Sequence, residues 1–154
     1  MKNYHYTECG LNNIYLENGF KITKNQDEEE VYIEDIHGLH KMIGISLIFK
    51  QGLLSGNEIK FIRHTIDFSQ TALAHTLGVD YQTVLGWEKN KRKISKTADH
   101  YLKTIFFAYL KKDSPIYELI NEIANLSAKE VDEKVHRVTM RVSEQEWHYV
   151  DKAA

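Results

Sequence analysis

Apolar residues in the middle of the chain recur every three or four positions, which is the period of an amphipathic helix. The first predicted helix begins after Asp35 and ends before Gly52. Ser55 and Glu58 then form a capping box, the reciprocal pair of side-chain bonds that opens a helix. The same spacing predicts helices over about 70–77, 81–89 and 97–112, one that starts at Ser114-Pro115, and a short one opened by a capping box at 127–130.

The two ends of the chain carry signals of β-strands instead. Residues 13–17 and 20–24 flank Asn18-Gly19, a pair favoured in the two-residue turn of a hairpin. A third strand is predicted at 31–33, after the acidic run 27–30, which we expect to form a solvated loop. Near the other end, apolar and polar residues alternate over 136–142, and a strand at 147–150 could pair back onto them. Because a lone strand is unstable, this terminal strand either completes the N-terminal sheet or adds to a sheet across a dimer.

The composition is that of an ordinary globular protein, with 154 residues of which 42% are hydrophobic and 27% charged. No apolar run approaches the roughly 20 residues of a membrane span. Residues 1–6 lack the apolar stretch of a secretory signal. The single cysteine, Cys9, excludes an internal disulfide and fits a reducing compartment. We therefore expect a cytoplasmic protein with no membrane partner.

The net charge of −2 hides an uneven distribution. Residues 55–112 hold ten Lys and Arg against five Asp and Glu, whereas residues 1–54 hold five against eight and residues 113–154 five against nine. Because screening limits charges to a Debye length of about 8–10 Å, the local balance matters more than the sum. The basic centre suits a phosphate-binding face, although clustered charge alone is just as typical of a solvated surface.

Two of the predicted helices hold the residue types that a tight, nearly perpendicular junction demands. At the fifth position counted from Gln70 the second helix passes over the first, and the small Ala74 stands there. The ninth position must turn the chain at positive φ, and it is Gly78. The positions expected to be buried are all apolar: Leu73, Leu77, Val79, Val84 and Trp87. The two N-cap positions are polar, with Ser69 before the first helix and Asp80 before the second.

An amphipathic helical hairpin without a nucleic-acid role explains the apolar residues of this motif equally well. It does not require Ala74 and Gly78 at those offsets, nor the small Gly86 on the exposed side of the second helix. These three residues favour a helix-turn-helix of the kind that binds double-stranded DNA.

The run Ser69-Gln70-x-x-Leu73-Ala74-x-x-x-Gly78-Val79 and its continuation Val84-x-x-Trp87-Glu88-x-Asn90 resemble the helix-turn-helix of the phage lambda repressor/Cro (Xre) family. The resemblance covers about residues 55–110 and implies a five-helix DNA-binding domain, typically dimeric on a palindromic operator. Asn90 departs from the glycine of most members, and Asn is the next best residue for a left-handed helix end.

By that resemblance the second helix enters the major groove, and its first residues meet the base edges. The residues assigned to base reading are Tyr81, Gln82 and Thr83, with Gly86 allowing close approach. The residues assigned to the DNA backbone are Gln70, Lys89, Lys91, Arg92 and Lys93. Trp87 is expected in the core, and Glu88 is expected to pair with Arg63.

The start of the chain, Tyr6-x-x-Cys9-Gly10 followed by a hairpin and a connecting helix, resembles MqsA-like antitoxins. In that group an N-terminal zinc domain with two Cys-x-x-Cys pairs can bind a toxin, and the C-terminal domain represses the operon. Here Tyr6 replaces a cysteine and Cys9 stands alone, whereas a structural zinc site needs four Cys or His ligands. No metal and no cofactor are expected, and Cys9 is predicted to be buried.

Histidines are frequent, eight in all, but none stands at a suggestive spacing from an acid or a nucleophile. His64, His75 and His100 are expected to face solvent or to be satisfied within the fold, so we expect a protein that is not an enzyme.

The predicted fold is α+β and mostly α, with a five-helix lambda-repressor-like domain between small β-rich ends. Its parts are a β-rich segment at 1–34, a connecting helix at 35–54, the DNA-binding domain at 55–112, and C-terminal helices with a β segment at 113–154 that pack with the first part. The predicted function is a sequence-specific transcriptional regulator, a homodimeric (auto)repressor on a palindromic operator. Two alternatives stay open: an antitoxin-like adaptor whose terminal part binds a toxin, and a regulator with a ligand pocket in the terminal part.

Overall fold

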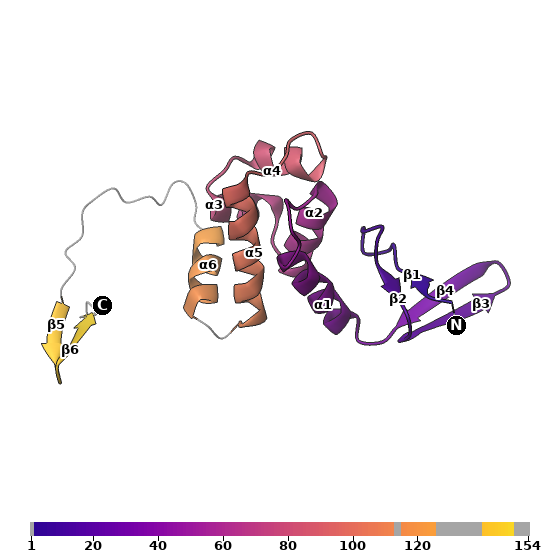
Figure 1. The fold of residues 1–154 in the computed structure, drawn as a ribbon, viewed down its shortest axis with the longest axis horizontal. Helices are drawn as coiled ribbons and strands as arrows, with labels where there is room; N and C mark the ends of the chain where they lie inside the picture. The colour runs from indigo at the N-terminus through magenta and orange to yellow at the C-terminus, as the bar shows by residue number, and fades with distance from the viewer. Residues whose placement is uncertain (1, 113–114, 126–139, 150–154) are drawn as a thin grey trace.

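The computed structural model describes residues 2–112, 115–125 and 140–149, and every structural statement below concerns these residues. They form an α+β arrangement in which helices make the centre and small antiparallel strand pairs stand toward the ends (Figure 1). The helices are α1 (Ile36–Ile48), α2 (Gly56–Thr65), α3 (Gln70–Leu77), α4 (Tyr81–Glu88), α5 (Lys96–Leu110) and α6 (Pro115–Asn125). The strands are β1 (Tyr4–His5), β2 (Tyr15–Leu16), β3 (Phe20–Asn25), β4 (Glu28–Ile33), β5 (Met140–Ser143) and β6 (Glu146–Tyr149).

Polar side chains open the helices where the sequence predicts. In the capping box of α2, the Glu58 N–H lies 3.3 Å from Ser55 Oγ and the Ser55 N–H lies 2.8 Å from Glu58 Oε1. Asp35 caps α1 by a single bond, in which its Oδ1 accepts the N–H of Gly38 at 3.2 Å. Helix α6 begins at Pro115, the first helical position, where a missing N–H costs nothing. Its predicted cap, Ser114, and the predicted helix at 127–130 lie outside the described residues.

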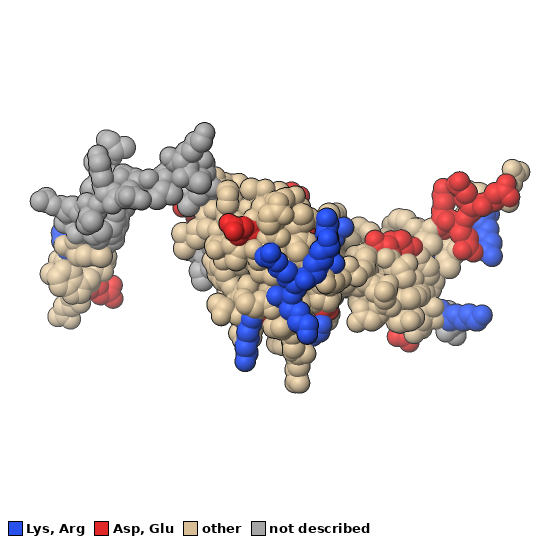
Figure 2. All heavy atoms as spheres, turned by 90° about the horizontal axis from the view of Figure 1, so that it is seen from above, with Lys and Arg blue, Asp and Glu red and all other residues tan. Residues whose placement is uncertain are grey.

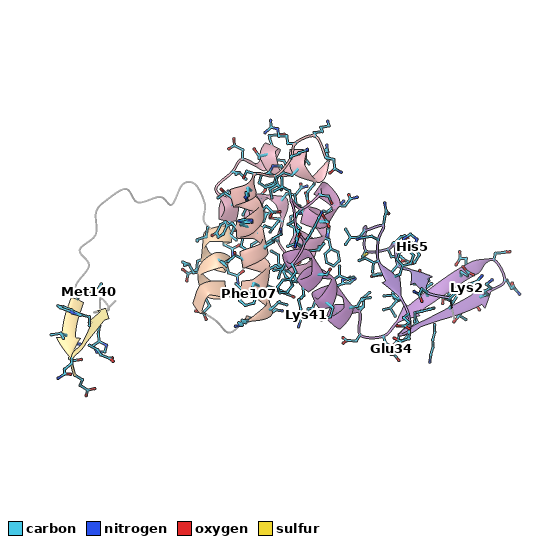
Figure 3. The ribbon with its side chains drawn as sticks, in the orientation of Figure 1. Lys2, His5, Glu34, Lys41, Phe107 and Met140 are labelled. Carbon is cyan, nitrogen blue, oxygen red and sulfur yellow. The ribbon has the colours of Figure 1, made fainter. Side chains whose placement is uncertain are left out.

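The helices share one apolar core. Side chains with no exposed surface come from four of them: Ile62, Leu73, Val84, Leu102, Ile105 and Phe106. Where α1 meets α5, the ring of Phe106 lies against Gly44, and a Cβ built on Gly44 would stand 2.1 Å from Phe106 Cζ. The side chains drawn in Figure 3 fill the space between these helices. Of the positions predicted to be buried around the α3–α4 turn, Leu73, Val84 and Trp87 are buried, whereas Leu77 and Val79 are half-buried.

The N-terminal strands pair differently from the prediction. Strand β2 pairs with β1 and strand β3 with β4, so Asn18-Gly19 joins two separate strand pairs. Gly19 has a φ of 78°, but Asn18 is not at positive φ, so the predicted hairpin turn is wrong. The physical reason is burial: Tyr6, Leu11 and Leu16 belong to the core, which holds β2 beside β1 instead of beside β3.

The acidic run 27–30 is also wrong as a loop, because Glu28, Glu29 and Glu30 are the first residues of β4. Glu29 lies opposite Lys24 in the strand register, and its Oε1 is 3.2 Å from Lys24 Nζ. Glutamate has a low intrinsic preference for strands. The opposite charge that faces Glu29 across the strand pair adds stabilisation to β4.

The C-terminal strands β5 and β6 form an antiparallel hairpin in which Val142 lies opposite Trp147. The predicted pairing of these two segments is confirmed, and the earlier part of the predicted strand, 136–139, lies outside the described residues. Within the described strands β5 pairs with β6 and not with the N-terminal sheets, so the first of the two predicted alternatives, that it completes the N-terminal sheet, is wrong. Its apolar side chains are more than half exposed, as for Met140, labelled on the hairpin in Figure 3.

None of the described helices is long and apolar enough to cross a lipid bilayer.

Candidate nucleic-acid interface

The turn between α3 and α4 is built by backbone hydrogen bonds around Gly78, whose φ is 68°. The Gly78 N–H lies 3.2 Å from the His75 carbonyl, and the Val79 N–H lies 3.0 Å from the Ala74 carbonyl. This is the Schellman pattern, which needs a residue that tolerates a left-handed backbone. Ala74 is 2% exposed. The predicted turn at Gly78 is confirmed, and Ala74 is buried, as its predicted role requires.

Helix α4 ends in the same way, with Asn90 at a φ of 57°. The Asn90 N–H bonds to the Trp87 carbonyl at 3.0 Å, and the Lys91 N–H bonds to the Gly86 carbonyl at 2.9 Å. The Asn90 side chain has a further role, because its Oδ1 accepts the N–H of Gly56 at 3.0 Å. A Cβ on Gly56 would lie 2.3 Å from the Trp87 carbonyl oxygen, so α2 approaches α4 through a glycine. Gly56 is not among the residues predicted from the sequence, and its one signal there is its position directly after an N-cap.

A buried polar cluster holds α2, α3 and α4 together. Arg63 Nε lies 2.7 Å from Glu88 Oε1, and Arg63 Nη1 donates to the Phe68 carbonyl at 3.0 Å. Gln70 Nε2 donates to the other carboxylate oxygen of Glu88. The side chains of Arg63 and Glu88 are only 10% and 4% exposed, so their charges depend on each other. The predicted Arg63–Glu88 pair is confirmed, and the Gln70 side chain is engaged inside the protein.

The first turn of α4 faces solvent. Tyr81 is 43% exposed, Gln82 is exposed and Thr83 is half-buried. Asp80 stands at the N-cap position, but its side chain makes no capping hydrogen bond, which corrects its predicted role. Polar side chains in the first turn of an accessible helix are the groups that can reach base edges in a major groove.

The turn after α4 carries exposed basic side chains: Lys89, Lys91, Arg92 and Lys93. Three acidic residues of the same region are buried: Glu58, Glu88 and Asp99. Each of these three has a basic partner: Lys50 at 2.6 Å, Arg63 at 2.7 Å and Lys103 at 2.8 Å. Because each buried acid is neutralised by a basic partner, the positive charge of the region lies with its other Lys and Arg side chains, which include the four of this turn. Figure 2, seen from the side where α4 lies, shows Lys and Arg gathered on the helical centre, with acidic side chains near the β3–β4 end.

Gly86 and Arg92 do not lie as their predicted roles imply. Gly86 is buried, because the Arg92 side chain lies against it: a Cβ built on Gly86 would meet Arg92 Cδ at 3.1 Å. Arg92 Nη1 also lies 3.4 Å from Thr83 Oγ1. Gly86, predicted to let α4 approach the DNA closely, is therefore covered by Arg92, which was predicted to contact the DNA backbone.

Tyr6 and Cys9 take part in packing at the N-terminal end of the chain. Tyr6 is 2% exposed, and its hydroxyl lies 2.8 Å from His40 Nε2. Cys9, predicted to be buried, is half-buried, and its Sγ lies 3.5 Å from the Tyr6 carbonyl oxygen. Within the described residues no group of three His, Cys, Asp or Glu side chains is arranged to hold a metal ion. A cavity of about 430 Å³ opens here, lined among others by Cys9, His40 and His64.

Two histidines that line this cavity have a lowered pKa. Burial lowers the pKa of His64, and the charges of Arg63 and Lys60 lower it further. His64 Nε2 lies 3.2 Å from Arg63 Nη2, and because a guanidinium only donates, the imidazole nitrogen accepts. Burial and His37 lower the pKa of His40.

Comparison of the chain with models of known families, with curated proteins and with solved structures gave no match.

Proposed function

We propose that this protein binds double-stranded DNA in a sequence-specific way and regulates transcription, with α4 lying in the major groove. The observation that carries the proposal is the exposed first turn of α4 beside a turn with four basic side chains. The first supplies groups that read base edges and the second supplies charge for phosphates. Helices α3 and α4 are held by two Schellman turns and a buried ion pair, so the reading turn is presented on a rigid support.

The proposed role of each residue at the DNA follows from where its side chain lies. Tyr81 and Gln82 face solvent and read bases, and the amide of Gln82 suits a bidentate bond to adenine. Lys89, Lys91 and Lys93 contact phosphates. Gln70 contacts a phosphate through its backbone N–H at the start of α3, because its side chain is bonded to Glu88.

The predicted DNA-binding domain, residues 55–112, holds the four described helices α2–α5, and α6 follows it; this helical arrangement supports a lambda-repressor-like domain as the DNA-binding unit. We propose that two copies bind a palindromic operator as a homodimer and act as an (auto)repressor. In that arrangement the half-sites lie about one helical turn, roughly 10 bp, apart.

Selection of bound duplexes from random DNA tests the proposal. We expect two related half-sites at a fixed spacing. Gln82→Ala should relax the preference at one base pair per half-site, whereas Lys93→Gln should weaken binding to all sequences about equally. Wild-type protein that enriches no sequence would overturn the proposal.

A second candidate, an adaptor that binds a protein partner such as a toxin, is favoured by one observation. The β5–β6 hairpin has three large apolar side chains that are more than half exposed: Met140, Val142 and Trp147. Such side chains in a group are typical of a protein-contacting surface. Purification of the full chain from its native host distinguishes the candidates: a stoichiometric second protein supports the adaptor, and a homodimer that shifts its own promoter supports the repressor.

A further inference from the structure

The Arg92 side chain lies across the recognition helix instead of extending into solvent beside it. Its Cδ and Cγ would lie 3.1 and 3.3 Å from a Cβ on Gly86, which are close contacts. Its Nη1 lies 3.4 Å from Thr83 Oγ1. Residues three and four apart share a helix face, so Gln82, Thr83 and Gly86 belong to one face of α4. The guanidinium of Arg92 therefore lies on the face assigned to base reading.

The backbone fixes this position. The left-handed residue Asn90 folds the chain back, and the N–H groups of both Lys91 and Arg92 bond to the Gly86 carbonyl, at 2.9 and 3.2 Å. The stem of Arg92 consequently starts beside Gly86 and packs on the surface that the missing side chain leaves open.

Within the part of the chain that the structure describes, the Arg92 guanidinium has no acidic partner to hold it. Among the ion pairs of residues 2–112, 115–125 and 140–149, none includes Arg92, whereas Arg63 is bound to Glu88. A guanidinium has five N–H donors, and the contact with Thr83 uses one. The remaining donors form the planar fork that matches O6 and N7 of guanine, the commonest specific contact in a major groove.

We propose that Arg92 is a specificity-determining residue that reads a guanine, and that Gly86 provides the surface of α4 on which the Arg92 stem packs. This inference rests on the proposed DNA binding and refines it: a residue outside the recognition helix supplies the side chain that position 86 lacks. It assigns Arg92 to base reading and removes it from the phosphate contacts.

The decisive variant is Arg92→Lys, which keeps the positive charge and loses the fork. Wild-type protein and the variant are each used for selection from random duplexes. We expect one G·C pair in the wild-type half-site to lose its preference by about 5- to 150-fold in Arg92→Lys. Affinity for unrelated DNA should stay within about twofold, because the charge is retained. Lys93→Gln is the matched control and should keep the G·C preference.

A chemical readout isolates the contact. Replacing that guanine by 7-deazaguanine removes N7 and should lower wild-type affinity while leaving Arg92→Lys affinity unchanged. Gly86→Ala alters no charge but pushes the Arg92 stem away, so it should lose part of the same preference. Circular dichroism melting checks that each variant is folded.

Two results separate the possible failures. If wild-type protein selects a half-site and Arg92→Lys selects the same one with equal sensitivity to 7-deazaguanine, the guanine contact is overturned and DNA binding stands. If wild-type protein selects nothing, the proposed function itself fails.

Discussion

The α3–α4 motif and the β3–β4 hairpin are both short pairs of neighbouring elements, with eight residues in each helix and six in each strand. In the motif, side chains such as Leu73 and Val84 have no exposed surface, and Glu88 forms a buried pair with Arg63 of α2. In the hairpin most side chains are exposed, and its ion pair, Lys24–Glu29, has side chains 78% and 58% exposed. One pair is positioned by tertiary packing and the other by its own strand pairing.

The contrast teaches where precision resides in this molecule. A buried charge pair leaves its partners one arrangement, because any displaced charge loses its compensation. An exposed pair exchanges its contact for water at little cost. The surface that is proposed to read DNA stands on the first kind of support.

The largest expected difference comes from removing one acid in each region. Glu88→Ala leaves Arg63 buried without its carboxylate and should lower the free energy of unfolding by about 3–5 kcal/mol. Glu29→Ala removes the exposed partner of Lys24 and should change it by about 0–1 kcal/mol. Urea unfolding of both variants measures the difference, and equal effects would contradict the contrast.

A second comparison concerns packing. Gly44→Ala places a methyl group where the Phe106 ring lies and should destabilise the protein by about 1–3 kcal/mol through overpacking. The side chain of Ile22 in β3 is 47% exposed, and Ile22→Ala should cost only about 0.5 kcal/mol. Thermal and urea unfolding compare the two. In a double-mutant cycle with Phe106→Leu, the Gly44→Ala loss should shrink, because the smaller side chain yields room; additive losses would refute overpacking.

The contact between the N-terminal strands and the helices should have an intermediate effect. Tyr6→Phe keeps the buried ring and removes the hydroxyl that lies 2.8 Å from His40 Nε2, at an expected cost of about 0.5–1.5 kcal/mol. Tyr32→Phe, at a residue that is 62% exposed, is the control and should be neutral. If both variants unfold at the same urea concentration, the Tyr6–His40 bond does not join the two regions.

The smallest expected effect is a dependence on pH. Because folding lowers the pKa of His64, this residue is protonated at a higher pH in the unfolded chain than in the folded protein. The contribution of His64 to the free energy of unfolding is therefore full above about pH 6.5 and declines as the pH drops through that value. His64→Gln should reduce the slope of unfolding free energy against pH between about 7 and 5 relative to the wild type. An unchanged slope would show that His64 does not contribute.

Local patterns predicted the helices well, because each is specified within a few residues. The capping box at Ser55 and Glu58 and the left-handed positions Gly78 and Asn90 are properties of short stretches of backbone. The Arg63–Glu88 pair was also predictable once the two helices had been placed by the motif. The strand pairing was not predictable in this way. Asn18-Gly19 indicates a turn, but burial of the strands in the core decides which strands pair.

Residue order alone thus specified the central helices, their caps and the tight α3–α4 turn, since these depend on hydrogen bonds within one or two turns of chain. Only the tertiary structure decided which strands pair, that the acidic run enters β4, and that Gly56 meets the end of α4. It also decided that Arg92 covers Gly86, because that contact depends on how the chain folds back after Asn90. These features join atoms whose proximity is set by packing, and packing is a property of the whole fold.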